Sequence, residues 1–150
     1  MRKLLFVSHA PSINTRQLRD VAVKAIAQYD VALDCRESLE ADVESVLACD
    51  GILIGTTENF GSIAGLTKDF FERIYYPCLE KTEGLPFAVY VRAGQDGAGS
   101  LLAIDRITTG LRWRSVQSPL LLQGEFDESF FAQVTVLAET FAAGLDLGLF

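Results

Sequence analysis

Short apolar runs alternate with stretches of helical periodicity along the whole chain. Three of the runs are almost continuously apolar, as expected of strands that are buried on both faces of a parallel sheet. Two runs are less regular, and Pro119 in the last one indicates an edge strand or a bulge, because proline cannot donate to the ladder. The predicted strands cover residues 4–7, 31–35, 51–55, 87–91 and 115–122.

The first and last predicted helices carry the clearest apolar stripes. In the first helix, apolar residues recur at i, i+3, i+4, i+7 and i+8 from Leu18 onward. Asn14 is predicted to cap this helix, with Gln17 three positions later completing a capping box. The last helix is predicted to bury a stripe made of Phe130, Val134, Leu137, Phe141 and Leu145.

Three further helices are predicted between the strands. Ser38 is expected to begin the second helix. A loop over residues 56–65 leads to the third, which is expected to run from an inward-pointing Leu66 until Pro77 breaks it. Gly110 is expected to end the fourth helix as its C′ residue, because glycine readily takes the left-handed conformation.

Five β-α units in succession predict a three-layer α/β sandwich with a five-stranded parallel sheet, since right-handed crossovers permit little else. The 150 residues fit one domain that spans positions 1–150. For a doubly wound sheet of this size, the expected strand order is 2-1-3-4-5. We therefore expect a ligand to bind at the carboxyl edge of the sheet, where the strand order reverses.

The composition excludes several classes of protein. A formal net charge of −7 argues against a nucleic-acid partner, because such proteins need a basic face. The charge still allows an anionic ligand, since backbone N–H groups at a helix N-terminus can hold a phosphate. The three cysteines form no CxxC pair, so neither a disulfide framework nor a metal site is expected. No apolar stretch suits a membrane span, and we expect a cytoplasmic protein.

Loops rich in glycine and small polar residues are predicted to meet at the carboxyl edge. In the first loop, the hydroxyls of Ser8, Ser12 and Thr15 can converge on a phosphate together with N–H groups of the first helical turn. Helix capping alone would explain one of these residues, but not three hydroxyls around one turn. The three loops cover residues 8–15, 56–65 and 92–100.

The second and third loops suit a flat ligand. Phe60 could cover one face of a heteroaromatic ring while Gly61 lets the backbone approach its polar edge. Alternatively, Phe60 folds back and covers the core beneath the loop. Arg92 could stabilise negative charge on such a ligand, or it could form a surface ion pair with one of the many acidic residues.

The segment from Gly55 to Asp69 reads G-T-T-E-N-F-G-S-I-A-G-L-T-K-D. It resembles the G-T-P-E-x-x-G-S-x-x-G-x-x-K pattern of flavodoxin-like NAD(P)H-dependent FMN reductases, with Thr57 at the position of the usual proline. The order of elements is similar to that of the flavodoxin family along the whole chain. The resemblance implies a flavodoxin-like fold, FMN as the cofactor and NAD(P)H as the electron donor.

The same resemblance assigns parts of FMN to the three loops. The first loop would hold the phosphate, the second would line the ring, and the third would meet the pyrimidine end of the ring. No catalytic or metal-binding residue is implied, and neither Glu58 nor the lone His9 is expected to be catalytic. The implied cofactor-binding residues are Ser8, Ser12, Asn14, Thr15, Thr56, Thr57, Glu58, Asn59, Phe60, Gly61, Arg92, Gly94 and Gly97.

Two functions are compatible with this resemblance. The first is an NAD(P)H-dependent oxidoreductase that passes electrons through flavin to a small acceptor such as a quinone or a free flavin. The second is a flavodoxin-type electron carrier whose acidic surface docks a redox partner protein. The first loop lacks the T-x-T-G-x-T signature of electron-transferring flavodoxins, which favours the enzyme. A scaffold that has lost its flavin is a third candidate.

Other proteins of similar topology lack support in the sequence. A receiver domain would need an aspartate after the third strand, and a dinucleotide-binding unit would need G-x-G-x-x-G after the first. A P-loop and the C-x5-R motif of small tyrosine phosphatases are absent as well. Reductases of the resembled family often form homodimers, so a homodimer is one assembly that the resemblance allows.

Overall fold

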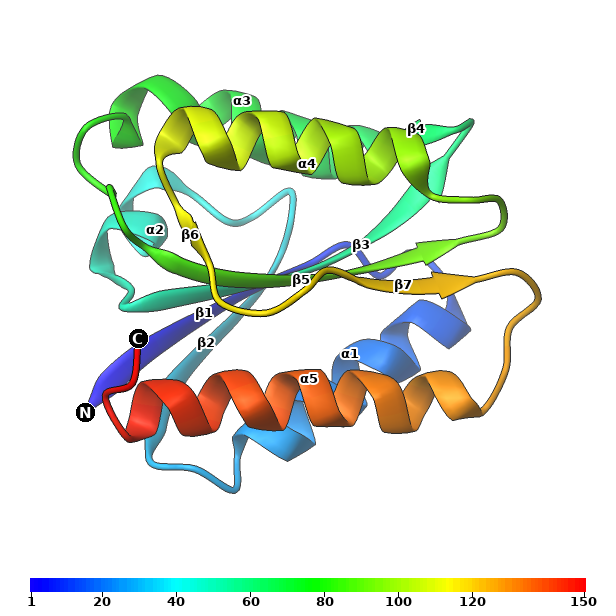
Figure 1. Cartoon of the computed structure of the whole chain (residues 1–150), viewed down its shortest axis with the longest axis horizontal. Helices are drawn as coiled ribbons and strands as arrows, with labels where there is room; N and C mark the ends of the chain where they lie inside the picture. The colour runs from blue at the N-terminus through cyan, green and yellow to red at the C-terminus, as the bar shows by residue number, and fades with distance from the viewer.

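The strands form one sheet, and helices cover both of its faces (Figure 1). The computed structural model describes residues 1–150. The strands are β1 (Arg2–Ser8), β2 (Val31–Glu37), β3 (Gly51–Asn59), β4 (Ser62–Ile63), β5 (Pro86–Ala93), β6 (Arg114–Ser115) and β7 (Leu120–Gln123). The helices are α1 (Ile13–Ile26), α2 (Val43–Ala48), α3 (Gly65–Cys78), α4 (Ala98–Leu111) and α5 (Ser129–Asp146).

The strand order confirms the prediction from the β-α pattern. The main path of the sheet is β2-β1-β3-β5-β6, with β7 also pairing with β5 and β4 pairing with β3. All pairs are parallel except β3 with β4. The predicted last strand over residues 115–122 is wrong in one respect, because it is split into β6 and β7. Pro119 lies between the two pieces, as expected of a residue that cannot donate to a ladder.

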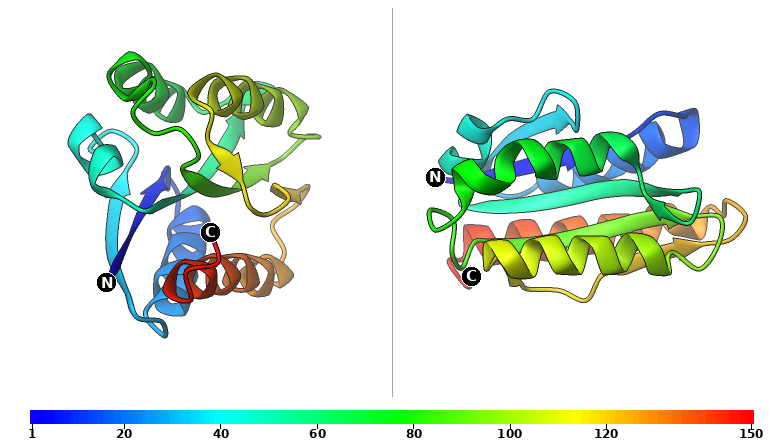
Figure 2. Two further views of the ribbon diagram at one scale, coloured as in Figure 1. Left: turned by 60° about the vertical axis from the view of Figure 1, so that its left-hand side comes forward. Right: turned by 90° about the horizontal axis from the view of Figure 1, so that it is seen from above.

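Two hydrophobic cores of similar size lie on opposite sides of the sheet. Helices α1 and α5 cover one face, while α2, α3 and α4 cover the other (Figure 2). The cores contain 17 and 19 buried residues, respectively. Both faces of β1, β3 and β5 are therefore buried, which explains why their sequences are continuously apolar instead of alternating.

Helix starts were predicted less well than strands. Asn14 does not cap α1: Ser12 is the N-cap residue, and Thr15 completes the capping box. The predicted start of the second helix at Ser38 is also wrong, because Asp42 caps a shorter helix that begins at Val43. In both cases a short polar side chain only two or four residues from the actual cap offered an equally plausible local cap.

The third and fourth helices also differ from expectation. Leu66 is exposed instead of pointing inward, and Pro77 lies inside the last turn of α3 instead of breaking it. Gly110 is helical, whereas Arg112 takes the left-handed conformation that ends α4. The reason is tertiary, because a Cβ at Gly110 would overlap the phenol of Tyr75 on α3. None of the helices combines the length and the apolar character that a membrane crossing requires.

Candidate functional site at the carboxyl edge

The three predicted loops meet at one end of the sheet. Strands β1, β3, β5 and β7 all end there, and helices α1, α4 and α5 all begin there, at the right of Figure 1. The β1 and β3 ends are directly joined, since the His9 N–H donates to the Gly55 carbonyl at 2.8 Å. The predicted convergence of the loops at the carboxyl edge is therefore confirmed.

In the first loop, Ser12 and Thr15 bind each other. The Thr15 N–H donates to Ser12 Oγ at 3.2 Å, and the Ser12 N–H donates to Thr15 Oγ1 at 2.9 Å. Thr15 Oγ1 also donates to the Ser12 carbonyl at 3.1 Å and lies 2.9 Å from Ser12 Oγ. The Thr15 hydroxyl is thus committed to shaping the turn, whereas the more exposed Ser12 hydroxyl can donate outward only by releasing its contact with Thr15 Oγ1.

Several donors around the start of α1 have no partner in the chain. The backbone N–H groups of Ile13 and Asn14 make no hydrogen bond. Ser8 Oγ, at the last position of β1, is buried and makes no well-oriented hydrogen bond, although the Tyr90 phenol lies close enough to interact with it. By strand alternation the Ser8 side chain lies on the face covered by α1, together with Leu4 and Phe6. Buried polar groups are normally satisfied, so this hydroxyl points to a missing acceptor.

These residues fit a phosphate group. The helix dipole and the two free N–H groups favour an anion, and Ser8 adds a buried hydroxyl on the same side of the sheet. The Asn14 side chain is exposed and makes no hydrogen bond, so it is free to bind as well. No group of histidine, cysteine or acidic side chains is arranged to hold a metal ion.

Tyr90 on β5 is part of this edge, and the sequence did not single it out. Its ring lies over the backbone of Gly55, where any Cβ would overlap the phenol. Burial raises the pKa of Tyr90, so its hydroxyl stays protonated and able to donate. The glycine at position 55 therefore has a packing reason: only this residue leaves room for the tyrosine.

The second loop is a β-hairpin. Glu58 pairs with Ile63 and Asn59 with Ser62, so β3 extends four residues beyond the predicted strand end at Gly55. Phe60 and Gly61 form the turn, with φ angles of 53° and 75°. Positive φ at both central positions is the geometry of a type I′ hairpin turn.

Phe60 was expected either to cover the ring of a ligand or to fold back onto the core. Its relative exposure is 106%, so it does not fold back onto the core, and that alternative is wrong. The ring stands free at the tip of the hairpin, where a flat ligand could contact it. Thr56 is turned the other way: it is buried, and its hydroxyl lies 2.7 Å from that of Thr67 on α3. The Thr57 hydroxyl donates to the side-chain oxygen of Asn59 at 3.0 Å.

The third loop is bound to this hairpin through Glu58. The carboxylate accepts hydrogen bonds from the N–H groups of Gln95 at 3.0 Å and Gly97 at 2.8 Å. Two of the donors predicted to meet the pyrimidine end of a ring are therefore already occupied. The N–H groups of Gly94 and Asp96 have no partner and remain free for a ligand.

Arg92 lies at the end of β5 on the face covered by α5. Its Nη1 donates to the carbonyls of Ala93 at 2.7 Å and Leu122 at 3.1 Å. The guanidinium lies 5.7 Å from the ring centroid of Phe126 and 5.2 Å from that of Phe130. It makes no ion pair, so the surface ion pair considered for it is wrong, and burial lowers its pKa. Its remaining nitrogens are free to bind an anionic group.

Glu37 on β2 braces the first loop, a role that no local pattern indicated. Its carboxylate accepts from Arg19 Nη1 at 3.0 Å and from the Ala10 N–H at 3.4 Å. The carboxylate also faces His9, whose pKa is lowered by burial and raised to a lesser extent by Glu37. The lowered pKa leaves His9 mainly neutral near neutral pH.

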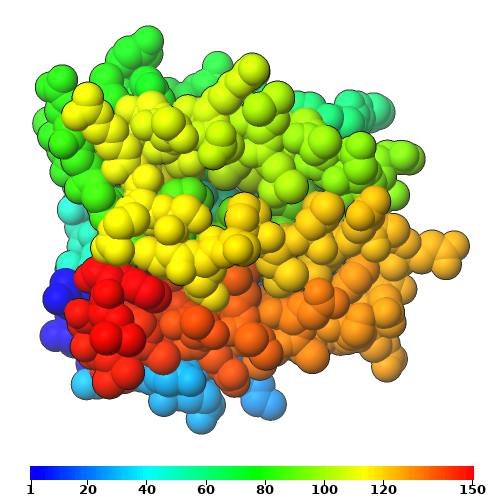
Figure 3. Space-filling view, viewed as in Figure 1, coloured from blue at the N-terminus to red at the C-terminus, as the bar shows by residue number.

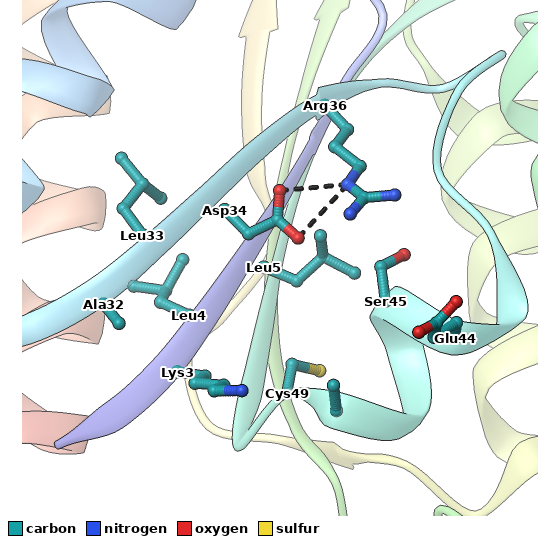
Figure 4. A pocket seen from close by; sticks show the side chains of 11 residues that line it. Lys3, Leu4, Leu5, Ala32, Leu33, Asp34, Arg36, Glu44, Ser45 and Cys49 are labelled. Atoms are coloured by element: carbon teal, nitrogen blue, oxygen red, sulfur yellow. Dashed lines mark hydrogen bonds and ion pairs between the residues drawn. The ribbon is translucent and has the colours of Figure 1, made fainter.

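A cavity of about 360 Å³ lies away from this edge. It is bounded by the first half of β1, by β2 and by the short helix α2, and Arg36 Nε donates to the Asp34 carboxylate at 3.0 and 3.1 Å along the β2 wall (Figure 4). Burial raises the pKa of Cys49 in its wall to about 12, so this thiol is not a nucleophile. The cavity contains none of the predicted site residues.

The outer edge of the sheet differs from the carboxyl edge. Figure 3 views this side: the segment around β6, the segment around β7 and the length of α5 form adjoining layers of the surface. A shallow groove there is lined by residues of the β6–β7 connection and α5, including Pro119 and Val136. None of the residues implied by the resemblance lines it.

Comparison with solved structures finds many similar folds. A flavodoxin from the domain Archaea is 13% identical, with a TM-score of 0.80 over 95% of this chain and 98% of that one. An NADH:FMN oxidoreductase in its apo form is 15% identical, with a TM-score of 0.75 over 97% and 90%. A WrbA-like flavodoxin from Agrobacterium tumefaciens is 14% identical, with a TM-score of 0.75 over 95% and 96%.

Comparisons of the sequence, by contrast, find no match. No model of a protein family matches this chain, and no curated protein matches it either. Likeness at 13–15% identity concerns the arrangement of the backbone. On that ground, and from its own strand order, the protein has a flavodoxin-like fold.

Proposed function

We propose that the protein binds FMN at the carboxyl edge and acts as an NAD(P)H-dependent oxidoreductase. The observation that carries this proposal is the unsatisfied donor set at the start of α1. Ser8 Oγ is buried without a partner, and the N–H groups of Ile13 and Asn14 are free. A phosphate is the ligand that this combination suits best, and similar folds include flavodoxins and an NADH:FMN oxidoreductase.

The chain's own residues would bind and orient the cofactor. Ser8, Ser12 and the first turn of α1 would hold the phosphate, while Phe60 and the free N–H groups of the third loop would contact the ring. Bound FMN would supply the hydride and electron chemistry, which none of the side chains at this edge provides. The Tyr90 and Glu58 side chains are committed to packing and to backbone donors, so they would shape the site instead of moving protons.

A flavodoxin-type electron carrier is the second candidate, and surface charge supports it. The net charge is −7, and the loop between β7 and α5 exposes Glu125, Asp127 and Glu128 at the carboxyl edge. An acidic rim of this kind speeds association with a basic partner, and salt screens that attraction. The carrier would need such a partner and no substrate of its own.

Titration with FMN tests cofactor binding, which both proposed functions require. The flavin's fluorescence is expected to be quenched on addition of apo-protein, with one binding site per chain. Riboflavin, which lacks the phosphate, should bind more weakly by at least about tenfold, because it loses charge-assisted hydrogen bonds at α1. Equal affinity for the two flavins would remove the phosphate site, and no binding at all would remove the proposal.

Anaerobic mixing with NADH or NADPH separates the enzyme from the carrier. Direct loss of the flavin absorbance supports the oxidoreductase, and adding a quinone should then restore it. A flavin that stays oxidised until a separate reductase is added supports the carrier. Docking to that reductase should weaken with rising salt if the acidic rim is responsible.

A further inference from the structure

We propose that Glu58 is a positioning residue: its carboxylate fastens the hairpin 58–63 to the start of α4 and thereby fixes Phe60 as an aromatic platform for a flat ring. The inference rests on the proposed binding of a flavin at this edge. It assigns to Glu58 a task other than direct contact with the ligand. It also explains why an exposed aromatic residue occupies a turn.

Glu58 is the main polar link between the two loops. Its oxygens bind the N–H groups of Gln95 at 3.0 Å and Gly97 at 2.8 Å, which lie just before α4. Gly97 caps that helix in the left-handed conformation and offers no side chain for the cap. Together with Asp96, whose carboxylate accepts from the Ala98 N–H at 3.0 Å, Glu58 places negative charge at a helix start, where the helix dipole favours it.

Close packing reinforces this link. Gly99, in the first turn of α4, approaches the carbonyl of Gly61 so closely that a Cβ would overlap it. The Ala64 N–H donates to the Thr57 carbonyl at 3.1 Å and closes the base of the hairpin. The hairpin is thus fixed at its base, along its side and near its tip, while the Phe60 ring stays exposed.

Phe60 is an unfavourable residue for its position. A φ of 53° places a bulky side chain in the left-handed region, where asparagine or glycine is preferred. The ring is also fully exposed and buries no apolar area. An outlier that costs stability in two ways is a reason to infer a function, and contact with a flat ligand would use both the ring and its fixed orientation.

The experiment combines two measurements on Glu58→Gln, with Glu125→Gln as the matched control. Glu125 is an exposed carboxylate at the same edge with no partner in the chain. In the absence of flavin, amide hydrogen exchange at Gln95 and Gly97 should accelerate by at least about tenfold in Glu58→Gln, because their charged acceptor is lost. Exchange in β1 and α5 should stay unchanged, which also shows that the variant is folded.

The second measurement is a double-mutant cycle on FMN affinity. Glu58→Gln and Phe60→Leu are each expected to raise the Kd by about tenfold. If Glu58 acts through Phe60, the double variant should be no weaker than the weaker single variant. The Kd of the Glu125→Gln control should match that of the wild type.

Each outcome bears on a separate part of the inference. Unchanged exchange at Gln95 and Gly97 overturns the fastening role, whether or not FMN binds. Accelerated exchange with additive effects in the cycle overturns the link to Phe60. If the wild type binds no FMN, the proposed function fails and the platform role fails with it, whereas the exchange data still decide the fastening role.

Discussion

Helices α1 and α4 begin at the same edge of the sheet, yet their first turns are satisfied differently. At α1, Ser12 and Thr15 bind each other and leave two N–H groups without a partner. At α4, Asp96 accepts from the Ala98 N–H at 3.0 Å and Glu58 accepts from the preceding N–H groups. The N–H groups of Gly99 and Ser100 there have no partner. Both starts leave N–H groups free, but two carboxylates of the chain bind N–H groups at residues 95–98 around the start of α4, whereas none binds an N–H group of residues 12–16 at α1.

The difference shows that a free helix N-terminus is informative only when the chain offers no acceptor of its own. Both loops are rich in glycine and small polar residues, so their compositions do not separate them. At α4, the carboxylates of Glu58 and Asp96 already place negative charge at the helix start, which disfavours a second anion there. We therefore assign the phosphate to α1, and the following variants test this contrast.

The largest effect on stability is expected from Gly99→Ala, which tests the packing of the hairpin on α4. The added Cβ would meet the backbone carbonyl of Gly61, which cannot turn aside as a side chain could. We expect the free energy of unfolding to fall by up to about 3 kcal/mol in a urea titration. Gly94→Ala is the matched control, because its Cβ would meet open space in the same loop. Equal stability of the two variants would show that the hairpin does not pack on α4 as described.

Thr15→Ala tests the start of α1. It removes the partner of Ser12, so the turn that presents the free N–H groups should loosen. FMN binding should weaken by roughly 1–3 kcal/mol, measured as Kd by fluorescence. Asn14→Ala is the comparison for stability. The Asn14 side chain makes no hydrogen bond, so this substitution should leave the free energy of unfolding unchanged. A Kd that Thr15→Ala does not alter would separate the capping box from the phosphate site.

Ser8→Ala should act in opposite directions on stability and binding. The hydroxyl is buried and unpartnered, so its removal should raise the free energy of unfolding of the apo-protein by about 1 kcal/mol. FMN affinity should fall at the same time, because the hydroxyl is expected to meet the phosphate. A variant that loses stability would mean that Ser8 already has a partner, and the phosphate site would lose its main support.

The smallest effect concerns pH and His9. Burial lowers the pKa of His9 below the ordinary value of 6.5, so the unfolded chain binds more protons just below that pH. The free energy of unfolding should therefore rise with pH through this window and decline as the pH falls. His9→Asn should flatten this part of the profile in urea titrations between about pH 5 and about pH 7.5. A profile that keeps its slope would assign the dependence to other groups.

The sequence predicted the framework because the framework depends on local patterns. Continuous apolar runs identified β1, β3 and β5, and the stripe from Phe130 to Leu145 identified α5. The predictions were wrong where two neighbouring polar residues could each cap a helix, as with the caps predicted at Asn14 and Ser38. The stretch from Thr56 to Gly65 was predicted as a loop, because a type I′ turn with Phe60 at its first position lacks the usual Asn-Gly signal.

By itself, the sequence determined the layers, the strand order and the edge where the loops gather, because periodicity and crossover handedness leave few alternatives. Only the tertiary structure decided which donors at that edge stay free. Glu58 lies 37 residues from Gln95 in the chain, and Glu37 lies 27 from Ala10. Such pairs follow from the packing of separate elements, so no local pattern could have indicated which helix start accepts a ligand.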